Sequence, residues 1–189
     1  MKVSREQAAE NRERIVDVAA QLFRERGFDG IGVADLMKGA GLTHGGFYGH
    51  FSSKEDLMAQ ACARALTRSR DDWNRLADQA ADNPVFAIIR AYLSTEHRDR
   101  PGSGCTLTAL GADIARQNPS VRGTVTDGVR SLVDVLARLI PGKSKAVKHE
   151  KALATFASMV GALVLARAVD DPALSEEILR TVSASISKQ

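Results

Sequence analysis

Apolar residues recur every three or four positions along most of this chain, without the strict alternation that marks strands. This spacing predicts amphipathic helices and an all-α fold. The first helix is expected to begin near Ser4, where Ser4 and Gln7 fit a capping box, and to end at Gly27. Its apolar stripe consists of Ile15, Val18, Ala19, Leu22 and Phe23.

The same criteria predict about nine helices in all. Two short helices, from about 33 and from 44, precede a long one that opens on a second capping box, Ser52 with Glu55. The segment "RDRPGSG" is the clearest loop. The later helices are expected at 84–93, 105–117, 118–139, 145–169 and 172–187.

Composition describes an ordinary globular chain of 189 residues, 44% hydrophobic and 26% charged. A net charge of +3 permits a nucleic-acid partner without requiring one. The charged start "MKVSREQAAENRER" does not resemble a signal peptide. The longest apolar stretch, 152–169, is interrupted by Thr155, Ser158 and Arg167, so it predicts a buried helix and not a membrane span. We therefore expect a cytoplasmic protein without a membrane partner.

The segment "GLTHGGFYGHFSSKEDL", 41–57, combines histidines, glycines and aromatics, a mixture that could form a metal site, a catalytic loop or a surface that recognises another molecule. A metal site is not expected: His44 and His50 are six residues apart, roughly 240° around a helix. No carboxylate or thiol nearby completes such a site. A catalytic site is not expected either, because the segment contains no nucleophile with an adjacent base and an orienting acid.

A surface that recognises another molecule fits the segment best. Two short helices joined by "AGLT" form a helix-turn-helix, whose second helix enters the DNA major groove. Phe47 and Phe51 are four residues apart and are expected to face inward. The outer face then carries Thr43, His44, Gly45, Tyr48 and Lys54. As an N-cap, Thr43 lies beside free backbone N–H groups that suit a phosphate, and Gly45 and Gly46 permit a close approach.

Residues 14–57 resemble the DNA-binding head of the tetracycline-repressor (TetR) family. The residues that carry the resemblance are Ala19, Phe23, Gly27, Phe28, Leu36, Ala40, Gly41, Thr43, Gly46, Phe47, Tyr48, His50, Phe51, Lys54 and Leu57. The resemblance implies a homodimeric repressor of a palindromic double-stranded DNA operator. It also implies an all-helical body that binds an unknown small molecule and thereby releases the DNA. A helix-turn-helix head of three helices is expected at 1–52, and a bundle for ligand sensing and dimerisation at 53–189.

By this resemblance Thr43, Tyr48 and Lys54 contact the DNA backbone, while His44 and Gly45 lie nearest the base edges. Gly46 and His50 complete the expected DNA-binding set. The sequence departs from the family at Ile31 and Gly32, where Thr and Ser are common, and at Gly49, where a larger polar residue is common. Residues 1–58 contain eight Lys/Arg and nine Asp/Glu, a net charge of −1, so a modest salt dependence is expected.

The last two helices are the expected dimer interface. Small and apolar residues follow one another there at helical spacing: Ala154, Ser158, Gly161, Ala162 and Leu165. Small residues permit close helix approach, and a C2 dimer matches a palindromic operator. The alternative is packing within one subunit.

A ligand pocket is expected among the middle helices. Its predicted lining is Trp73, Phe86, Tyr92, Leu107, Leu110 and Phe156, with plain core packing as the alternative. No cofactor and no metal are expected.

Cys105 follows "PGSG" and opens a helix, where free N–H groups favour a thiolate. His97, Arg98 and Arg100 are close in sequence, and "GC" here resembles a subset of the family whose cysteine senses electrophiles or oxidants. The alternative is a small buried hydrophobe, which is what Cys62 is expected to be.

Three functions follow in order of preference. The first is a ligand-responsive repressor, with thiol sensing at Cys105 as a variant of it. A small helical enzyme that pairs Cys105 with His97 lacks a third orienting residue and leaves 14–57 unexplained, so no enzyme is expected. An architectural DNA-binding protein would not need so long and apolar a body.

Overall fold

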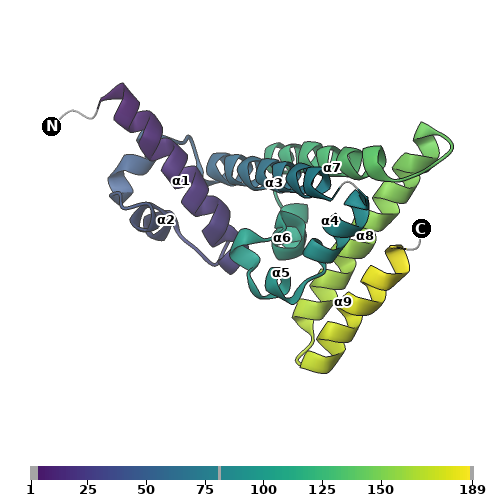
Figure 1. Ribbon diagram of the computed structural model, residues 1–189. Helices are drawn as coiled ribbons and strands as arrows, with labels where there is room; N and C mark the ends of the chain where they lie inside the picture. The colour runs from purple at the N-terminus through teal and green to yellow at the C-terminus, as the bar shows by residue number, and fades with distance from the viewer. Residues whose placement is uncertain (1–3, 81, 188–189) are drawn as a thin grey trace.

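The computed structural model describes residues 4–80 and 82–187, and these residues form an all-helical protein. The head contains α1, α2 and a 3-10 helix, η1, and Figure 1 shows it at one end of the molecule. The bounds of the helices are α1 Arg5–Arg26, α2 Val33–Gly39, η1 His44–Gly49, α3 Lys54–Gln79, α4 Pro84–Tyr92, α5 Thr95–Asp99, η2 Pro101–Ser103, α6 Thr106–Ala115, α7 Pro119–Leu139, α8 Lys145–Ala168 and α9 Pro172–Ile186.

Side-chain caps set where several of these helices begin. Ser4 Oγ accepts from Gln7 N at 3.1 Å, as the sequence predicts. The predicted cap of α3 at Ser52 is wrong by one residue: Ser53 Oγ accepts from Asp56 N at 3.1 Å. Ser52 instead donates its N–H and its hydroxyl to Asp56 Oδ2, at 3.0 and 3.1 Å. The two adjacent serines therefore share one acidic residue, and the sequence pattern alone does not separate their roles.

The second short helix is a 3-10 helix and not the α-helix that the sequence suggests. Three of its six residues are Gly45, Gly46 and Gly49, which weaken an α-helix by about 1 kcal/mol each. Its bonds close over three residues, as in the bond from Gly46 N to Thr43 O at 3.1 Å. The segment is nevertheless held in place, because Phe47 is fully buried beneath it.

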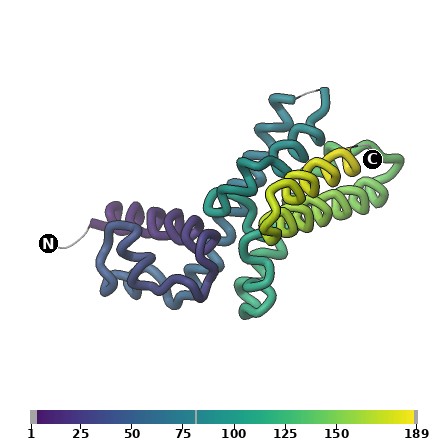
Figure 2. Tube along the Cα trace, turned by 90° about the horizontal axis from the view of Figure 1, so that it is seen from below, coloured from purple at the N-terminus to yellow at the C-terminus, as the bar shows by residue number. Residues whose placement is uncertain are grey.

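The long helix α3 connects the head with the body. It packs against α1 on one side and against α7 on the other, and the body continues through α4 to α9. Figure 2 shows head and body as two lobes. The proposed division between 52 and 53 stays a prediction, because α3 belongs to the packing of both lobes.

The predicted loop 98–104 is more regular than the sequence suggests. It begins within α5 and includes η2, so the chain makes two short helical turns before α6. α8 is the single described helix that is long and apolar enough to cross a membrane, a test that core helices of globular proteins also pass. It packs against α7 and α9, and Figure 1 shows α8 and α9 side by side at the far end from the head.

Candidate DNA-binding surface and sensor cluster

The exposed side of η1 carries most of the predicted DNA-binding residues. Thr43, His44, Gly45 and Tyr48 are exposed, and the Tyr48 side chain is 72% accessible. Gly46 and His50 are half-buried. Most of the Tyr48 ring is therefore exposed to solvent, where it can contact another molecule. We call Thr43, His44, Gly45 and Tyr48 the recognition surface.

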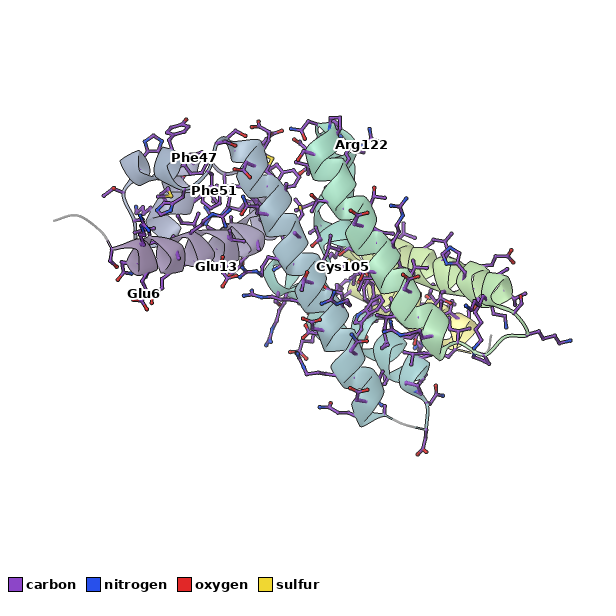
Figure 3. All side chains as sticks on the ribbon, turned by 90° about the horizontal axis from the view of Figure 1, so that it is seen from above. Glu6, Glu13, Phe47, Phe51, Cys105 and Arg122 are labelled. Atoms are coloured by element: carbon purple, nitrogen blue, oxygen red, sulfur yellow. The ribbon has the colours of Figure 1, made fainter. Side chains whose placement is uncertain are left out.

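Two aromatic anchors hold this surface. Phe47 and Phe51 are buried beneath η1 with ring centres 5.6 Å apart, and Tyr48 meets the edge of Phe47 at 5.2 Å. Arg12 of α1 places its guanidinium 5.2 Å from the centre of the Phe51 ring. Figure 3 shows Phe47 and Phe51 between the helices of the head. Sequence reasoning found the two anchors and missed Arg12, which adds a cation beside η1.

Lys54 is less free than predicted. Its ammonium donates to the carbonyl of Phe28 at 2.6 Å, and the side chain is half-buried. This bond ties the start of α3 to the beginning of the α1–α2 connection, just after α1. Because an ammonium has three donors, Lys54 retains donors for a phosphate while it holds the head together.

Cys105 lies at the N-cap position of α6 and is buried, with 4% of the residue exposed. Its N–H donates to His97 Nε2 at 2.9 Å, and His97 Nδ1 lies 2.7 Å from the Tyr92 carbonyl. Nε2 must accept here, so Nδ1 carries the proton and donates to Tyr92. Gly104 permits this arrangement, because a Cβ there would lie 2.7 Å from His97 Nε2.

The Cys105–His97 pair of the rejected enzyme alternative is not formed. Both ring nitrogens of His97 bind backbone groups, and neither is left to take a proton from the thiol. Burial is the main cause that lowers the pKa of His97 and keeps the ring neutral. His97 acts as a brace that joins the end of α4 to the start of α6.

The cations near Cys105 are not those nearest in sequence. Arg98 pairs with Asp99 and Arg100 pairs with Glu96 at the surface. The charges that act on the Cys105 thiol come from Arg24 of α1 and Arg167 of α8. Burial lowers the pKa of both guanidiniums, and Cys105 partly offsets this. We call Arg24, Tyr92, His97, Cys105 and Arg167 the sensor cluster.

Each arginine of the sensor cluster binds backbone carbonyls. Arg24 donates to Gly102 O through Nε at 3.0 Å and through its second nitrogen at 2.5 Å. Arg167 donates to Arg98 O at 3.0 Å, to His97 O at 2.7 Å and to Thr108 Oγ1 at 2.9 Å. Figure 3 shows Cys105 in the interior of the body.

Comparison with known proteins assigns the fold and the head. A family model described as bacterial regulatory proteins, tetR family, matches residues 15–61. The transcriptional repressor AcnR of Corynebacterium diphtheriae is 30% identical over 139 residues, which cover 72% of this chain and 67% of AcnR. This chain belongs to the tetR family. It is a helix-turn-helix DNA-binding transcriptional regulator, and its relatives are regulators and not enzymes.

Two other relatives show how far the likeness reaches. The repressor NemR of Escherichia coli K12 is 25% identical over 134 residues, or 69% of this chain and 67% of NemR. The crystal structure of reduced E. coli NemR has the same fold, with a TM-score of 0.79, 22% identity and coverage of 95% of this chain and 97% of that one. The match to the regulator YerO of Bacillus subtilis, 27% identical over 60% of this chain, spans only 39% of YerO.

The predicted ligand pocket of this tetR-family protein is not one cavity. Trp73 packs edge to face against Tyr92 at 6.0 Å and against Phe156 at 5.7 Å. These rings and Leu110 are buried, and Leu107 is half-buried at the edge of the core. The plain-core alternative therefore describes these five residues. The sixth, Phe86, is 40% exposed and lines a separate cavity of about 360 Å³ at the far end of the bundle.

The predicted dimer residues are mostly on an open face of α8. Ala154, Gly161 and Leu165 are exposed, with Leu165 57% accessible, and Ser158 is half-buried. The prediction that Ala162 belongs to the dimer interface is wrong, because Ala162 is 3% exposed and packs inside its own subunit. The open face continues the stripe with further uncharged residues that the sequence reading missed: Leu153, Ala157, Val164 and Ala168.

The described residues contain no cluster of three or more His, Cys, Asp or Glu side chains that would hold a metal ion. Cys62 lies inside α3, where burial raises its pKa to about 12. This environment fits the inert packing role that the sequence suggests for it, since a thiol with so high a pKa stays protonated at neutral pH.

Proposed function

We propose that this protein is a homodimeric repressor that acts in the cytoplasm on a palindromic operator and leaves it when a signal reaches the body. The recognition surface of each subunit enters one major groove. Thr43, Tyr48, Gly46, His50 and Lys54 contact the DNA backbone, and His44 and Gly45 lie nearest the bases. The observation that carries this proposal is the exposed polar face of η1 above buried Phe47 and Phe51.

Selection of binding sites from a random DNA pool tests this proposal. The selected sequence should contain two half-sites related by a dyad and separated by about one helical turn or a small multiple of it. His44→Ala should change the preferred bases, and Tyr48→Ala should weaken binding to every sequence alike. His149→Ala changes an exposed histidine on α8 and is the matched control. Failure to enrich any palindrome, or an unchanged preference in His44→Ala, contradicts the proposal.

The dimer is proposed to form through α8 and α9. The exposed uncharged stripe on α8 includes Gly161, where a Cβ would meet nothing within 4 Å in the subunit. Gly161→Arg should therefore leave the fold of the subunit intact and place a long cation in the interface, which separates the subunits. Gly123→Arg on α7 is the matched control, because its Cβ position is equally open. Light scattering that shows Gly161→Arg as a dimer would place the interface elsewhere.

We infer that the signal is a chemical modification of Cys105. Two observations support this: the rings of the expected pocket fill it, and Cys105 lies beside the contacts between head and body. Gly102, three residues before Cys105, binds Arg24 of α1, and Asp113 of α6 accepts from Phe28 N at 3.4 Å. A displacement at the start of α6 would therefore act on α1 through both contacts. Coupling of this kind is typically worth about 1–3 kcal/mol.

Operator binding before and after treatment with hydrogen peroxide tests the signal. Wild type and Cys62→Ala should lose affinity on treatment, and a reductant should restore it. Cys105→Ala should keep its affinity throughout. If Cys105→Ala is released as readily as wild type, the signal is not at Cys105. A non-covalent small molecule is then the effector, and the cavity of about 360 Å³ beside Phe86 is the place to seek it.

A further inference from the structure

The Tyr92 hydroxyl makes no hydrogen bond of ordinary geometry among the described residues, although the residue is only 4% exposed and its nearest polar contact is the Cys105 side chain. Buried hydroxyls are nearly always satisfied, so an unpartnered one needs an explanation. The Tyr92 ring meets the His97 ring edge to face at 4.7 Å, and His97 binds the Cys105 N–H at 2.9 Å. The phenol and the Cys105 thiol thus belong to one buried group, in which the two side chains act directly on each other.

The surroundings of Cys105 restrict the size of its reaction partner. The thiol is enclosed by the sensor cluster, and η2 in front of it is fixed to α1 by Arg24. A groove runs along α1, α3 and η2, and Arg24 and Gly102 form part of its wall, whereas Cys105 does not line it. A reagent of the size of water can reach a buried thiol through small local openings, whereas a ring-sized electrophile needs η2 to detach.

We propose that Cys105 is oxidised by small peroxides, and that the Tyr92 hydroxyl donates a hydrogen bond to the oxygen gained by the sulfur. This inference rests on the proposed function, in which modification of Cys105 is the signal. The thiolate sulfur attacks one oxygen of hydrogen peroxide, so that an S–O bond forms and the O–O bond breaks. The sulfur loses two electrons to the peroxide. The departing hydroxide takes up the proton that the thiol released, and the products are a sulfenic acid and water.

The sensor cluster can stabilise an oxygen bound to the Cys105 sulfur in two ways. First, Tyr92 remains a donor, because burial above all, and then the charge of Cys105 and a hydrogen bond to its side chain, raise the pKa of Tyr92 well above the ordinary value. Second, Arg24 and Arg167 place two positive charges near Cys105, and these charges attract the partial negative charge of an oxygen bound to the sulfur. A hydrogen bond from Tyr92 to the new oxygen draws electron density away from the sulfur. The sulfur is the atom that would attack a second peroxide, so the bound sulfenic acid should resist further oxidation.

Tyr92→Phe tests the role of the hydroxyl, and Tyr48→Phe is the matched control, since these are the two tyrosines of the chain. Each variant is treated with hydrogen peroxide, and the singly and doubly oxidised forms of Cys105 are followed by mass spectrometry with and without a sulfenic-acid trap. In Tyr92→Phe the ratio of second to first oxidation should rise about tenfold, the effect of one lost hydrogen bond. In Tyr48→Phe the ratio should equal that of wild type.

The size restriction is tested on the native protein and on the same protein in denaturant. Relative to the denatured chain, Cys105 in the native protein should be strongly protected from N-ethylmaleimide and far less protected from hydrogen peroxide. Equal protection from both reagents overturns the restriction to small oxidants. Cys62, measured in the same digests, should be protected from both.

The outcomes separate this inference from the proposed function. If peroxide releases Cys105→Ala from the operator, the proposed signal fails and this inference fails with it. If Cys105→Ala is unresponsive but Tyr92→Phe oxidises as wild type does, the signal stands and the role of Tyr92 is overturned. A Cys62–Cys105 disulfide as the first product also overturns it, because no oxygen then remains on the sulfur.

Discussion

The recognition surface and the sensor cluster satisfy their polar groups in opposite ways. Tyr48 and its neighbours on η1 are exposed, so their polar groups face solvent. In the sensor cluster, by contrast, Arg24, His97 and Arg167 all bind backbone groups inside the protein. Changes on the surface should therefore alter binding at little cost in stability. Changes in the cluster should alter stability and signalling together, because the same bonds serve both.

The largest effect is expected from Arg167→Ala. The change removes three hydrogen bonds at once and leaves the carbonyls of His97 and Arg98 without that donor. Unfolding by urea should show a loss of about 3 kcal/mol, since each unsatisfied buried group costs about 1–3 kcal/mol. Arg130→Ala, an exposed arginine of α7, is the control and should change stability by less than about 0.5 kcal/mol. Equal losses in both variants would remove the distinction between cluster and surface.

Arg24→Ala should have the next largest effect, on stability and on coupling. Losing the charged bonds to Gly102 should cost about 2 kcal/mol. It should also free η2 from α1, so that oxidised and reduced protein bind the operator more equally than in wild type. Arg68→Ala, a half-exposed arginine beside the same groove, is the control for the local loss of charge. If Arg24→Ala keeps the full response to peroxide, the signal reaches the head by another route.

The two regions also differ in how far sequence reasoning could reach them. The recognition surface and its anchors lie within a few residues of one another, so helical spacing was enough to place Phe47, Phe51 and Tyr48. The sensor cluster joins α1, α4, α5, α6 and α8, and Arg24 and Arg167 are far from Cys105 in sequence. No periodicity links them, and the cations nearest in sequence, Arg98 and Arg100, pair elsewhere.

The same contrast between local pattern and tertiary packing applies to the positions of the helices. Long amphipathic helices were predicted within a few residues, because their apolar stripes repeat many times. The predicted loop 98–104 includes η2 and the last two residues of α5, because helices of five or three residues show no period in the sequence. The choice between Ser52 and Ser53 as the cap of α3 depends on the direction of the chain after Phe51, which is a tertiary property. Likewise, whether aromatic residues line a pocket or fill a core depends on packing between helices.

Lys54 tests the boundary between the two regions, because it belongs to the predicted DNA contacts and also holds Phe28. Lys54→Met should destabilise the protein by about 1 kcal/mol, a value reduced by the partial exposure of the side chain. It should also weaken binding to all DNA sequences and reduce the salt slope by about one unit. Lys38→Met, on the exposed side of α2, is the control for stability. An unchanged salt slope would assign Lys54 to the fold alone.

The smallest effect concerns the pH dependence of stability through His97. Burial is the largest cause that lowers its pKa; the bond to the Tyr92 carbonyl opposes this, and the charges of Arg167 and Arg24 add to it. In the unfolded chain this histidine has an ordinary pKa of about 6.5. Between that value and the lower pKa of the folded protein, the unfolded chain binds a proton at this position and the folded protein does not. Stability from this source is complete above about pH 6.5 and falls as the pH drops toward the folded pKa. No other titratable group needs to change for this loss to occur.

His97→Gln isolates the contribution, because glutamine can donate to the Tyr92 carbonyl and accept from the Cys105 N–H but does not titrate. Urea unfolding is measured for both proteins at several values between about pH 8 and pH 5.5. The difference in free energy between wild type and His97→Gln should be constant at the upper end and should shrink as the pH falls, since only wild type loses the histidine term. Acidic groups titrate in both proteins and cancel in the difference. A difference that stays constant across the range would mean that His97 takes up its proton equally in both states, and that the buried brace between α4 and α6 is as open to water as the recognition surface.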